Sequence, residues 1–362
     1  MNEIDESHLT KGTQSQFLPG TKVQFAWDST SLGLLKTCPR LYQYVIIEGW
    51  TTKGESTHLR FGIEYHKALE DYDHALALGQ PRADAIRHSV KQLLIRTQGW
   101  DPESTAITDR EIKAAKYKSR DTLLSLVIDY LDFFENDPAK TYIKADGKPA
   151  VELSFRLEMD WGPDASDGVS SWETVEINEI EPQPGFGPIE VKQKYTFKPN
   201  QPYLLCGHLD RVVDFHGSLY VMDRKTSQAT LGQYYFAQYE PHNQMTLYTL
   251  AGQTVLHSPI KGVMIDAAQI MLTEPNRYVR GMTHRTPDQL EEWMNDLQIL
   301  LRQAEEYANI NHWPMNDTAC DKFGGCKFRE ICSKDPAVRP RFLKANFIKQ
   351  EEDERWNPLK AR

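Results

Sequence analysis

Two apolar-rich segments on either side of a tight-turn signal constrain the fold of this chain most. Leu204 to Phe215 and Leu219 to Arg224 have the composition of β-strands. His216-Gly217 lies between them and is typical of a two-residue hairpin turn. Such a turn pairs Phe215 with Ser218 and fixes the register of every residue pair farther along the hairpin.

Two acids and a lysine are placed by this register. Counting outward from the turn, Asp210 falls opposite Asp223, and Lys225 shares the face of Asp223 because side chains alternate along a strand. Two acids facing each other repel unless a divalent cation lies between them. A three-residue turn would instead move Asp210 to the other face. The alternative interpretation is ordinary surface charge on a half-exposed hairpin.

Composition limits the class of protein. The chain has 362 residues, 40% of them hydrophobic and 26% charged, which is typical of a globular protein with a sizeable core. A net charge of −9 argues against a basic surface all round but allows one basic groove. No apolar run approaches the roughly 20 residues of a membrane span. Met1 to Gly20 is polar, so we expect a cytoplasmic protein whose five cysteines stay reduced.

The order of predicted elements indicates one α/β domain at 25–336. We expect a flexible tail at 1–24, a helical insertion at about 67–148, extra hairpins or a surface insertion in the acidic, Gly-, Pro- and Ser-rich stretch 160–200, and a charged, mobile tail at 337–362. The predicted helices cover 28–46 (interrupted at Pro39), 59–78, 82–98, 109–134, 231–256 and 287–309, and further strands cover 151–157 and 261–272.

The cysteines form the second strong pattern. Cys320, Cys326 and Cys332 make a C-x5-C-x5-C cluster in a polar, glycine-containing loop, and Cys38 is a remote fourth. Four thiols suit an iron–sulfur cluster or zinc. The spacing is unlike the close C-x2-C pairs of zinc ribbons, which favours iron–sulfur, with zinc and simple packing as alternatives. Cys206 lies in an apolar strand and is expected in the core.

Two helical motifs complete the set. Gly62 precedes His66 by four residues in one predicted helix, and Gln244 precedes Tyr248 by four in another, so each pair shares a helix face. Taken alone, each has a plain alternative: a packed histidine, and helix surface with a core tyrosine. The run Tyr234-Tyr235-Phe236 indicates packing rather than a base-stacking platform.

In chain order these motifs resemble the RecB-like branch of the PD-(D/E)XK nucleases, over about residues 27–335. The family's G-x3-H, G-x2-D, D-x-K and Q-x3-Y motifs appear as Gly62…His66, Gly207…Asp210, Asp223…Lys225 and Gln244…Tyr248. The split cysteine site is similar to that of CRISPR-associated RecB-like exonucleases and AddB-type nuclease subunits, with Cys38-Pro39-Arg40 and Cys326–Cys332 as the cluster motifs. The C-x5-C-x5-C spacing departs from the C-x2-C pair common in relatives.

The resemblance implies a restriction-endonuclease-like core sheet flanked by helices, with the chain ends joined by a 4Fe-4S cluster on Cys38, Cys320, Cys326 and Cys332. It implies that Mg²⁺ or Mn²⁺ is held by His66, Asp210, Asp223 and the backbone carbonyl of Arg224. Lys225 would act on the attacking water or on the transition state, with Gln244 and Tyr248 orienting the groups around it. Glu152 would support the metal-binding residues without contacting the metal itself.

The implied activity is metal-dependent DNA exonuclease action at single-stranded ends or flaps, in recombination, repair or phage DNA processing. No helicase motif is present, so the resemblance is to a stand-alone nuclease of the kind carried by phages. Lys113, Lys116, Lys118 and Arg120 would contact phosphates from the helical insertion, or form a solvated face. Two alternatives are a nuclease-fold DNA-end-binding subunit of a recombination, integration or defence complex with protein partners, and an unrelated α/β binding protein with a zinc staple.

Overall fold

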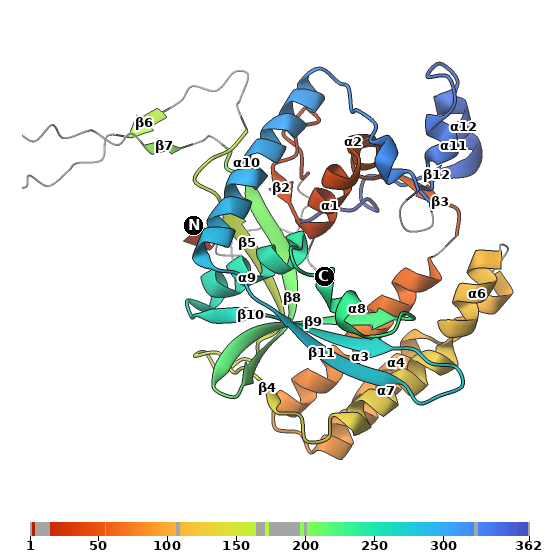
Figure 1. The fold of residues 1–362 in the computed structure, drawn as a ribbon, viewed down its shortest axis with the longest axis vertical. Coiled ribbons are helices and arrows are strands. Elements are labelled where there is room, and N and C mark those ends of the chain that lie inside the picture. Colours follow the sequence, from red (N-terminus) through yellow and green to blue (C-terminus); the bar gives the residue numbers. More distant parts are fainter. Residues whose placement is uncertain are drawn as a thin grey trace, which may run out of the picture.

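A mixed β-sheet flanked by helices forms the centre of the protein in a computed structural model (Figure 1). The structure describes residues 2–3, 15–54, 56–105, 109–163, 171–173, 196–198, 201–321 and 325–360. The α/β architecture predicted from the sequence is confirmed. The sheet contains β1 (Asn2–Glu3), β2 (Ala26–Trp27), β4 (Ala139–Thr141), β5 (Val151–Glu158), β8 (Leu204–Phe215), β9 (Ser218–Ser227), β10 (Ile260–Gln269) and β11 (Arg277–Thr283).

The predicted hairpin lies in the middle of this sheet. The strand order is β1-β5-β8-β9-β10-β11, and β2 and β4 also pair with β8. Phe215 pairs with Ser218 across the β8–β9 turn, as predicted, and the antiparallel ladder continues to Arg211 opposite Met222. The turn itself is formed by His216 and Gly217, both with positive φ, as a type I′ hairpin requires.

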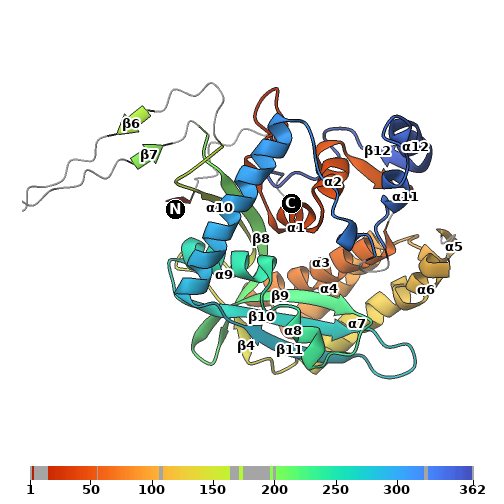
Figure 2. The ribbon, with the colours of Figure 1, turned by 45° about the horizontal axis from the view of Figure 1, so that its top comes forward.

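Helices cover both faces of the sheet. Side chains of β10 point alternately to the two faces, and those on each face pack into a different apolar cluster. Val263, Ile265 and Ala267 join one apolar cluster with residues of the first helix set, whereas Ala268 joins a second cluster with the other set (Figures 1 and 2). The first set is α1 (Ser29–Thr37), α9 (Asn243–Leu256) and α10 (Pro287–Asn309), and the second is α3 (Thr57–Ala77), α4 (Arg82–Arg96) and α7 (Arg120–Phe133).

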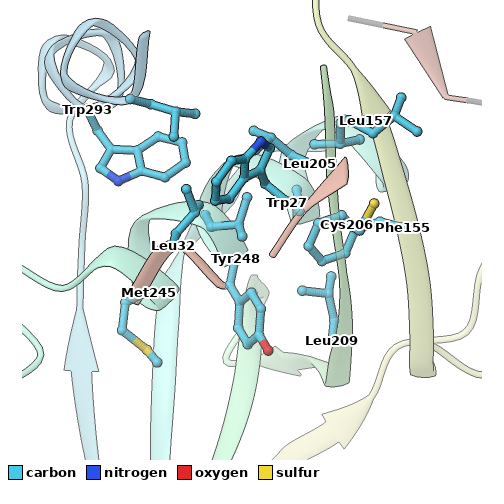
Figure 3. Close-up of a cluster of buried hydrophobic side chains, with 14 of the residues drawn as sticks. Trp27, Leu32, Phe155, Leu157, Leu205, Cys206, Leu209, Met245, Tyr248 and Trp293 are labelled. Carbon is cyan, nitrogen blue, oxygen red and sulfur yellow. The ribbon is translucent and has the colours of Figure 1, made fainter. Parts of the chain in front are cut away.

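The larger apolar cluster fixes α9 against the hairpin. Trp27, Leu205 and Leu209 pack there with Met245 and Tyr248 of α9, and Tyr248 directs its ring inward while its hydroxyl oxygen lies at the edge of the cluster (Figure 3). α9 connects β9 to β10, which run parallel, so it is the crossover helix of a βαβ unit. This packing brings the helix carrying Gln244 alongside the strand carrying Asp223.

Three predicted helices are broken in the structure. The helix expected at 231–256 is α8 (Gln233–Ala237) followed by α9, because Pro241 between them has no N–H to continue a helix. The one expected at 109–134 is α6 (Asp109–Tyr117) and α7, since Ser119 begins α7 with a capping box. Pro39 interrupts the first helix as predicted: α1 is followed by α2 (Pro39–Tyr42) and the π-helical turn η2 (Gln43–Ile47).

Described parts of both terminal segments, for which tails were expected at 1–24 and 337–362, contact the body of the protein. β1 pairs with β5, and the indole of Trp356 donates to Asp28 at 3.1 Å. The C-terminal segment also forms α12 (Arg339–Asn346) and β12 (Phe347–Lys349), which pairs with β3 (Trp50–Thr52). Apolar and aromatic side chains between the charges, such as Leu343 and Phe347, bury against the body and explain this packing.

Most of the insertion expected at 160–200 lies outside the described residues. Two strands within it, β6 (Ser171–Glu173) and β7 (Thr196–Lys198), pair antiparallel, in agreement with an extra hairpin. The remaining short helices are α5 (Pro102–Thr105), the 3₁₀ turn η3 (Asp317–Ala319) and α11 (Arg329–Cys332).

Candidate active site

The hairpin register brings the two predicted acids together at the centre of the sheet. The β8–β9 ladder ends at the Arg211–Met222 pair, and its register places Asp210 of β8 and Asp223 of β9 at the next position. Asp223 is 2% exposed and Asp210 is 9% exposed, although an isolated carboxylate is rarely buried. The observed register agrees with a two-residue turn, and each buried carboxylate needs a polar or charged partner.

His66 on α3 is the partner of Asp210. Its Nδ1 lies 3.2 Å from Asp210 Oδ2, and the backbone N–H of Arg224 donates to the same oxygen at 3.0 Å. Burial raises the pKa of Asp210, but His66, Lys225 and the Arg224 N–H outweigh it, so the pKa lies well below its usual value. Burial conversely lowers the pKa of His66, and the attraction of Asp210 outweighs that effect and raises it.

Lys225 is the partner of Asp223 and also contacts Gln244 of the Gln244…Tyr248 motif on α9. Its Nζ lies 2.7 Å from Asp223 Oδ2 and donates to Gln244 Oε1 at 3.3 Å. The Gln244 amide in turn donates to the Tyr248 hydroxyl at 3.0 Å. Burial lowers the pKa of Lys225, but Asp223 and Asp210 outweigh it and raise that pKa, so Lys225 is a cation at neutral pH.

The two acids differ in their environments. Burial raises the pKa of Asp223, the charge of Asp210 raises it further, and Lys225 only partly opposes both effects. The pKa values of the two carboxyl groups are therefore moved apart, as at sites where neighbouring acids have different roles. Divalent cations bind this kind of donor set, because carboxylate oxygens, a backbone carbonyl and one imidazole suit Mg²⁺ or Mn²⁺.

The donor types fit a hard cation, while their present partners are one another. Asp210 Oδ2 contacts His66 and the Arg224 N–H, and Asp223 Oδ2 contacts Lys225. Within the described ranges, no three His, Cys, Asp or Glu side chains are grouped closely enough to hold a metal ion. Cation binding would therefore exchange these contacts for metal–ligand bonds.

Glu152 lies on β5, next to Asp210. Val151 pairs with Arg211 and Leu153 pairs with Leu209, so Glu152 lies beside Asp210 on the side away from Asp223. Its φ is 49°, a left-handed value that side-chain-bearing residues adopt mainly at bulges and functional sites. Its Oε1 lies 4.0 Å from Nδ1 of His208. This neighbourhood is compatible with the supporting role expected for Glu152, and it adds His208, which no motif indicated.

A buried ion-pair network under the site was not anticipated. Arg224 Nη2 lies 2.5 Å from Asp73 Oδ2 on α3, and Arg211 Nη1 lies 3.5 Å from Asp73 Oδ1. Farther along the same face, Arg280 pairs with Asp137 at 2.6 Å and with Asp266 at 3.1 Å. The sequence signal for Asp73 was its spacing of seven residues from His66, which puts both on one side of α3.

The four predicted cluster cysteines line one cavity. Cys38, Cys320, Cys326 and Cys332 border it together with Leu41 and Tyr44, and Cys206 is buried in the core, as expected. The Asn316 N–H donates to Cys38 Sγ at 3.3 Å. The cavity lies between the first helices and the loop that carries the other three cysteines, so the fold brings the remote Cys38 next to them. As with the acids, these thiols are not grouped closely enough, among the described residues, to hold a metal ion in their present positions.

The basic residues of the helical insertion differ from one another in environment. Lys113 and Lys116 are exposed on α6, whereas Lys118 is 6% exposed, with its Nζ 5.3 Å from the centre of the Phe61 ring. Arg120 donates to Thr97 Oγ1 at 3.2 Å. The expectation that Lys118 contacts phosphate is therefore wrong, because its side chain is buried with the ammonium group over the Phe61 ring.

Comparison with known proteins agrees with this geometry. The model of the PD-(D/E)XK nuclease superfamily matches residues 27–333, and no match was found among curated proteins. Across the described residues, no helix has the length and apolar character needed to cross a membrane. The match covers most of the chain, including both acids and the lysine of the hairpin. The chain therefore belongs to the PD-(D/E)XK nuclease superfamily.

Proposed function

We propose that this protein hydrolyses phosphodiester bonds in DNA with Mg²⁺ or Mn²⁺. The observation that carries the proposal is the buried pair Asp210 and Asp223, in register on neighbouring strands, with His66 and Lys225 within 3.2 Å and 2.7 Å of them. Such a concentration of charge is costly to bury without a functional reason. A bound divalent cation would lower the pKa of a coordinated water and offset charge at the scissile phosphate.

The chain's own groups have separate roles in this proposal. Asp210, Asp223, His66 and the Arg224 carbonyl would hold the cation. Lys225, whose Nζ lies 2.7 Å from Asp223 Oδ2, would act on the attacking water or stabilise negative charge on the phosphate. Gln244 accepts from Lys225 and donates to Tyr248, which fixes the direction of the ammonium group.

We further propose exonuclease action at single-stranded ends or flaps, in recombination, repair or phage DNA processing. Support comes from the four ordered motifs that resemble the RecB-like branch and from the exposed Lys113 and Lys116 on the helical insertion. Phosphate contacts of this kind make binding weaken steeply with salt. A DNA-end-binding subunit without cleavage activity is the alternative, and intact acids together with Lys225 favour the enzyme.

We also propose that Cys38, Cys320, Cys326 and Cys332 hold a 4Fe-4S cluster with a structural role, zinc being the less favoured occupant. Support comes from the single cavity that all four side chains line and from the N–H that Asn316 directs at Cys38 Sγ. When bound, the cluster would join the N-terminal helices to the C-terminal loop. Its removal would therefore lower stability before it changes the chemistry at Asp210.

End-labelled single- and double-stranded DNA, digested with Mg²⁺ or Mn²⁺, tests the nuclease proposal. We expect Asp223→Ala and Lys225→Ala to lower the cleavage rate by about 10³-fold. Asp214→Ala is the matched control, because Asp214 lies on the same hairpin but is exposed, and its Oδ1 accepts the Gly217 N–H at 2.8 Å. Cleavage at the wild-type rate by the first two variants would refute the assignment. The position of the label released first distinguishes exonuclease from endonuclease action.

A further inference from the structure

We propose that Asp73 is a positioning residue that sets the relative placement of Asp210, Asp223 and His66. This inference rests on the proposed function, because it concerns the same metal-binding groups. Asp73 touches none of them. It acts through the two arginines that directly follow the acids in the chain, Arg211 and Arg224.

The two arginines connect one carboxylate to both catalytic strands. Arg211 follows Asp210 on β8, and its Nη1 lies 3.5 Å from Asp73 Oδ1. Arg224 follows Asp223 on β9, and its Nη2 lies 2.5 Å from Asp73 Oδ2. Because side chains alternate along a strand, each arginine projects to the face of the sheet opposite its acid. Asp73 therefore joins β8 to β9 at the residues next to the proposed ligands.

Asp73 also fixes the helix that carries His66. Seven residues, or about two helical turns, separate them, so both point toward the sheet from one side of α3. α3 is thus attached to the hairpin at two points, His66 to Asp210 and Asp73 to Arg224. Contacts at two separated points fix the direction of the helix axis, whereas a single contact would leave the helix free to pivot.

Arg224 transmits this placement to the site through its main chain. Its side chain holds Asp73 while its backbone N–H donates to Asp210 Oδ2 at 3.0 Å. Side chains of Asp73 and Arg224 are each 2% exposed. A buried ion pair is weak evidence for stability, because an apolar pair of similar size often stabilises a fold as well. The buried Asp73 carboxylate is better explained by a positioning role, because β8, β9 and α3 are all held together through it.

Mn²⁺ binding to the full-length protein, measured by titration calorimetry in the absence of DNA, tests the inference. We expect Asp73→Asn to raise the Kd for Mn²⁺ about 10-fold or more, as loss of groups behind metal ligands commonly does. Asp71→Asn is the matched control: Asp71 lies on the same helix and pairs with Arg96 of α4 at 2.8 Å, so its ion pair among the described residues joins α3 to α4 and not to the hairpin. We expect its Kd to stay within about 2-fold of wild type.

Three outcomes would overturn the inference. They are an unchanged Kd in folded Asp73→Asn, an equal loss of affinity in Asp71→Asn, and, should Asp73→Asn fail to fold, an unchanged Kd in Arg224→Lys. Arg224→Lys keeps the positive charge but loses the planar fork that spans Asp73. Absence of Mn²⁺ binding in the wild-type protein would instead refute the proposed metal site itself, so the two failures are distinguishable.

Discussion

The same substitution, glycine to alanine, should have opposite effects at the two glycines of the G-x2-D and G-x3-H motifs. Gly207 pairs across the sheet with Phe155, and a Cβ built on Gly207 would lie 2.6 Å from Phe155 Cζ and 2.8 Å from its Cε1. Phe155 is 2% exposed and packs edge-on against Tyr248, with ring centroids 6.3 Å apart. The ring therefore has no free space to move into, and its displacement would press on the tyrosine that holds Gln244.

The expected magnitudes follow from these contacts. Overpacking of a tight core typically lowers the free energy of unfolding by about 1–3 kcal/mol, so we expect Gly207→Ala to be destabilised by that amount. Gly62 lies inside α3, and a Cβ there meets no heavy atom within 4 Å. Gly62→Ala should therefore be more stable than wild type by about 0.5–1 kcal/mol, because alanine favours the helix.

Urea unfolding followed by circular dichroism measures both effects, with equal denaturant slopes as the check that only stability has changed. Phe155→Leu in the Gly207→Ala background should restore part of the lost stability, since the smaller side chain makes room for the new methyl group. Gly207→Ala with wild-type stability, or Gly62→Ala less stable than wild type, would refute the packing argument. The two variants together show that core packing requires a glycine at Gly207 but not at Gly62.

Three further predictions concern charges and thiols. Burial lowers the pKa of Lys118 from 10.5 to about 8, so its destabilising effect is complete below pH 8 and disappears as the pH rises toward 10.5. Lys118→Met should accordingly stabilise the protein by about 2 kcal/mol at neutral pH, with a gain that shrinks above pH 8 in urea titrations; a constant gain would contradict this. Arg280→Met removes the arginine partner of Asp266, which is 1% exposed and keeps only the Tyr130 hydroxyl among its side-chain partners in the described residues, and should lower the unfolding free energy by about 3 kcal/mol in the same assay. A neutral effect would contradict the pairing. Cys38→Ser should lose bound iron and visible absorbance after anaerobic purification while Cys206→Ala keeps both, and equal iron content in the two variants would argue against the four-cysteine site.

The part of the site predicted best from sequence is the part controlled by local geometry. His216-Gly217 fixes a two-residue turn, the turn fixes the register, and the register places Asp210 opposite Asp223. Strand alternation then puts Lys225 on the face that α9 covers, where it meets Gln244. Each step depends on neighbours in the chain, so each could be worked out without the tertiary structure.

The parts that sequence did not predict depend on contacts between distant segments. Asp73 and Arg224 lie far apart in the chain, and no local pattern shows that their charges meet beneath the sheet. Lys118 has the sequence context of a solvated helix face, and only the packing of Phe61 beside it shows that it points inward. The helix predicted across Pro241 was wrong for a different reason: apolar periodicity continued through a residue that cannot continue a helix.

The C-terminal segment illustrates the limit of composition. Its many charges predict a mobile tail, yet Trp356 and Phe347 bind it to the body of the protein. The large apolar residues within this charged stretch were the sequence feature that indicated packing. They can be buried only against a surface formed by β3 and the first helices. That surface exists only after the fold has formed.

DNA cleavage by protein first stripped of cations with a chelator tests whether Asp210 and Asp223 form a metal-dependent nuclease site. We predict no cleavage by the stripped wild-type protein, recovery when Mg²⁺ or Mn²⁺ is added, and no recovery in Asp210→Asn or Asp223→Asn. We further predict that Asp214→Asn recovers like wild type. Cleavage that persists without a cation, or that returns in both the Asp210→Asn and Asp223→Asn variants, would contradict this assignment.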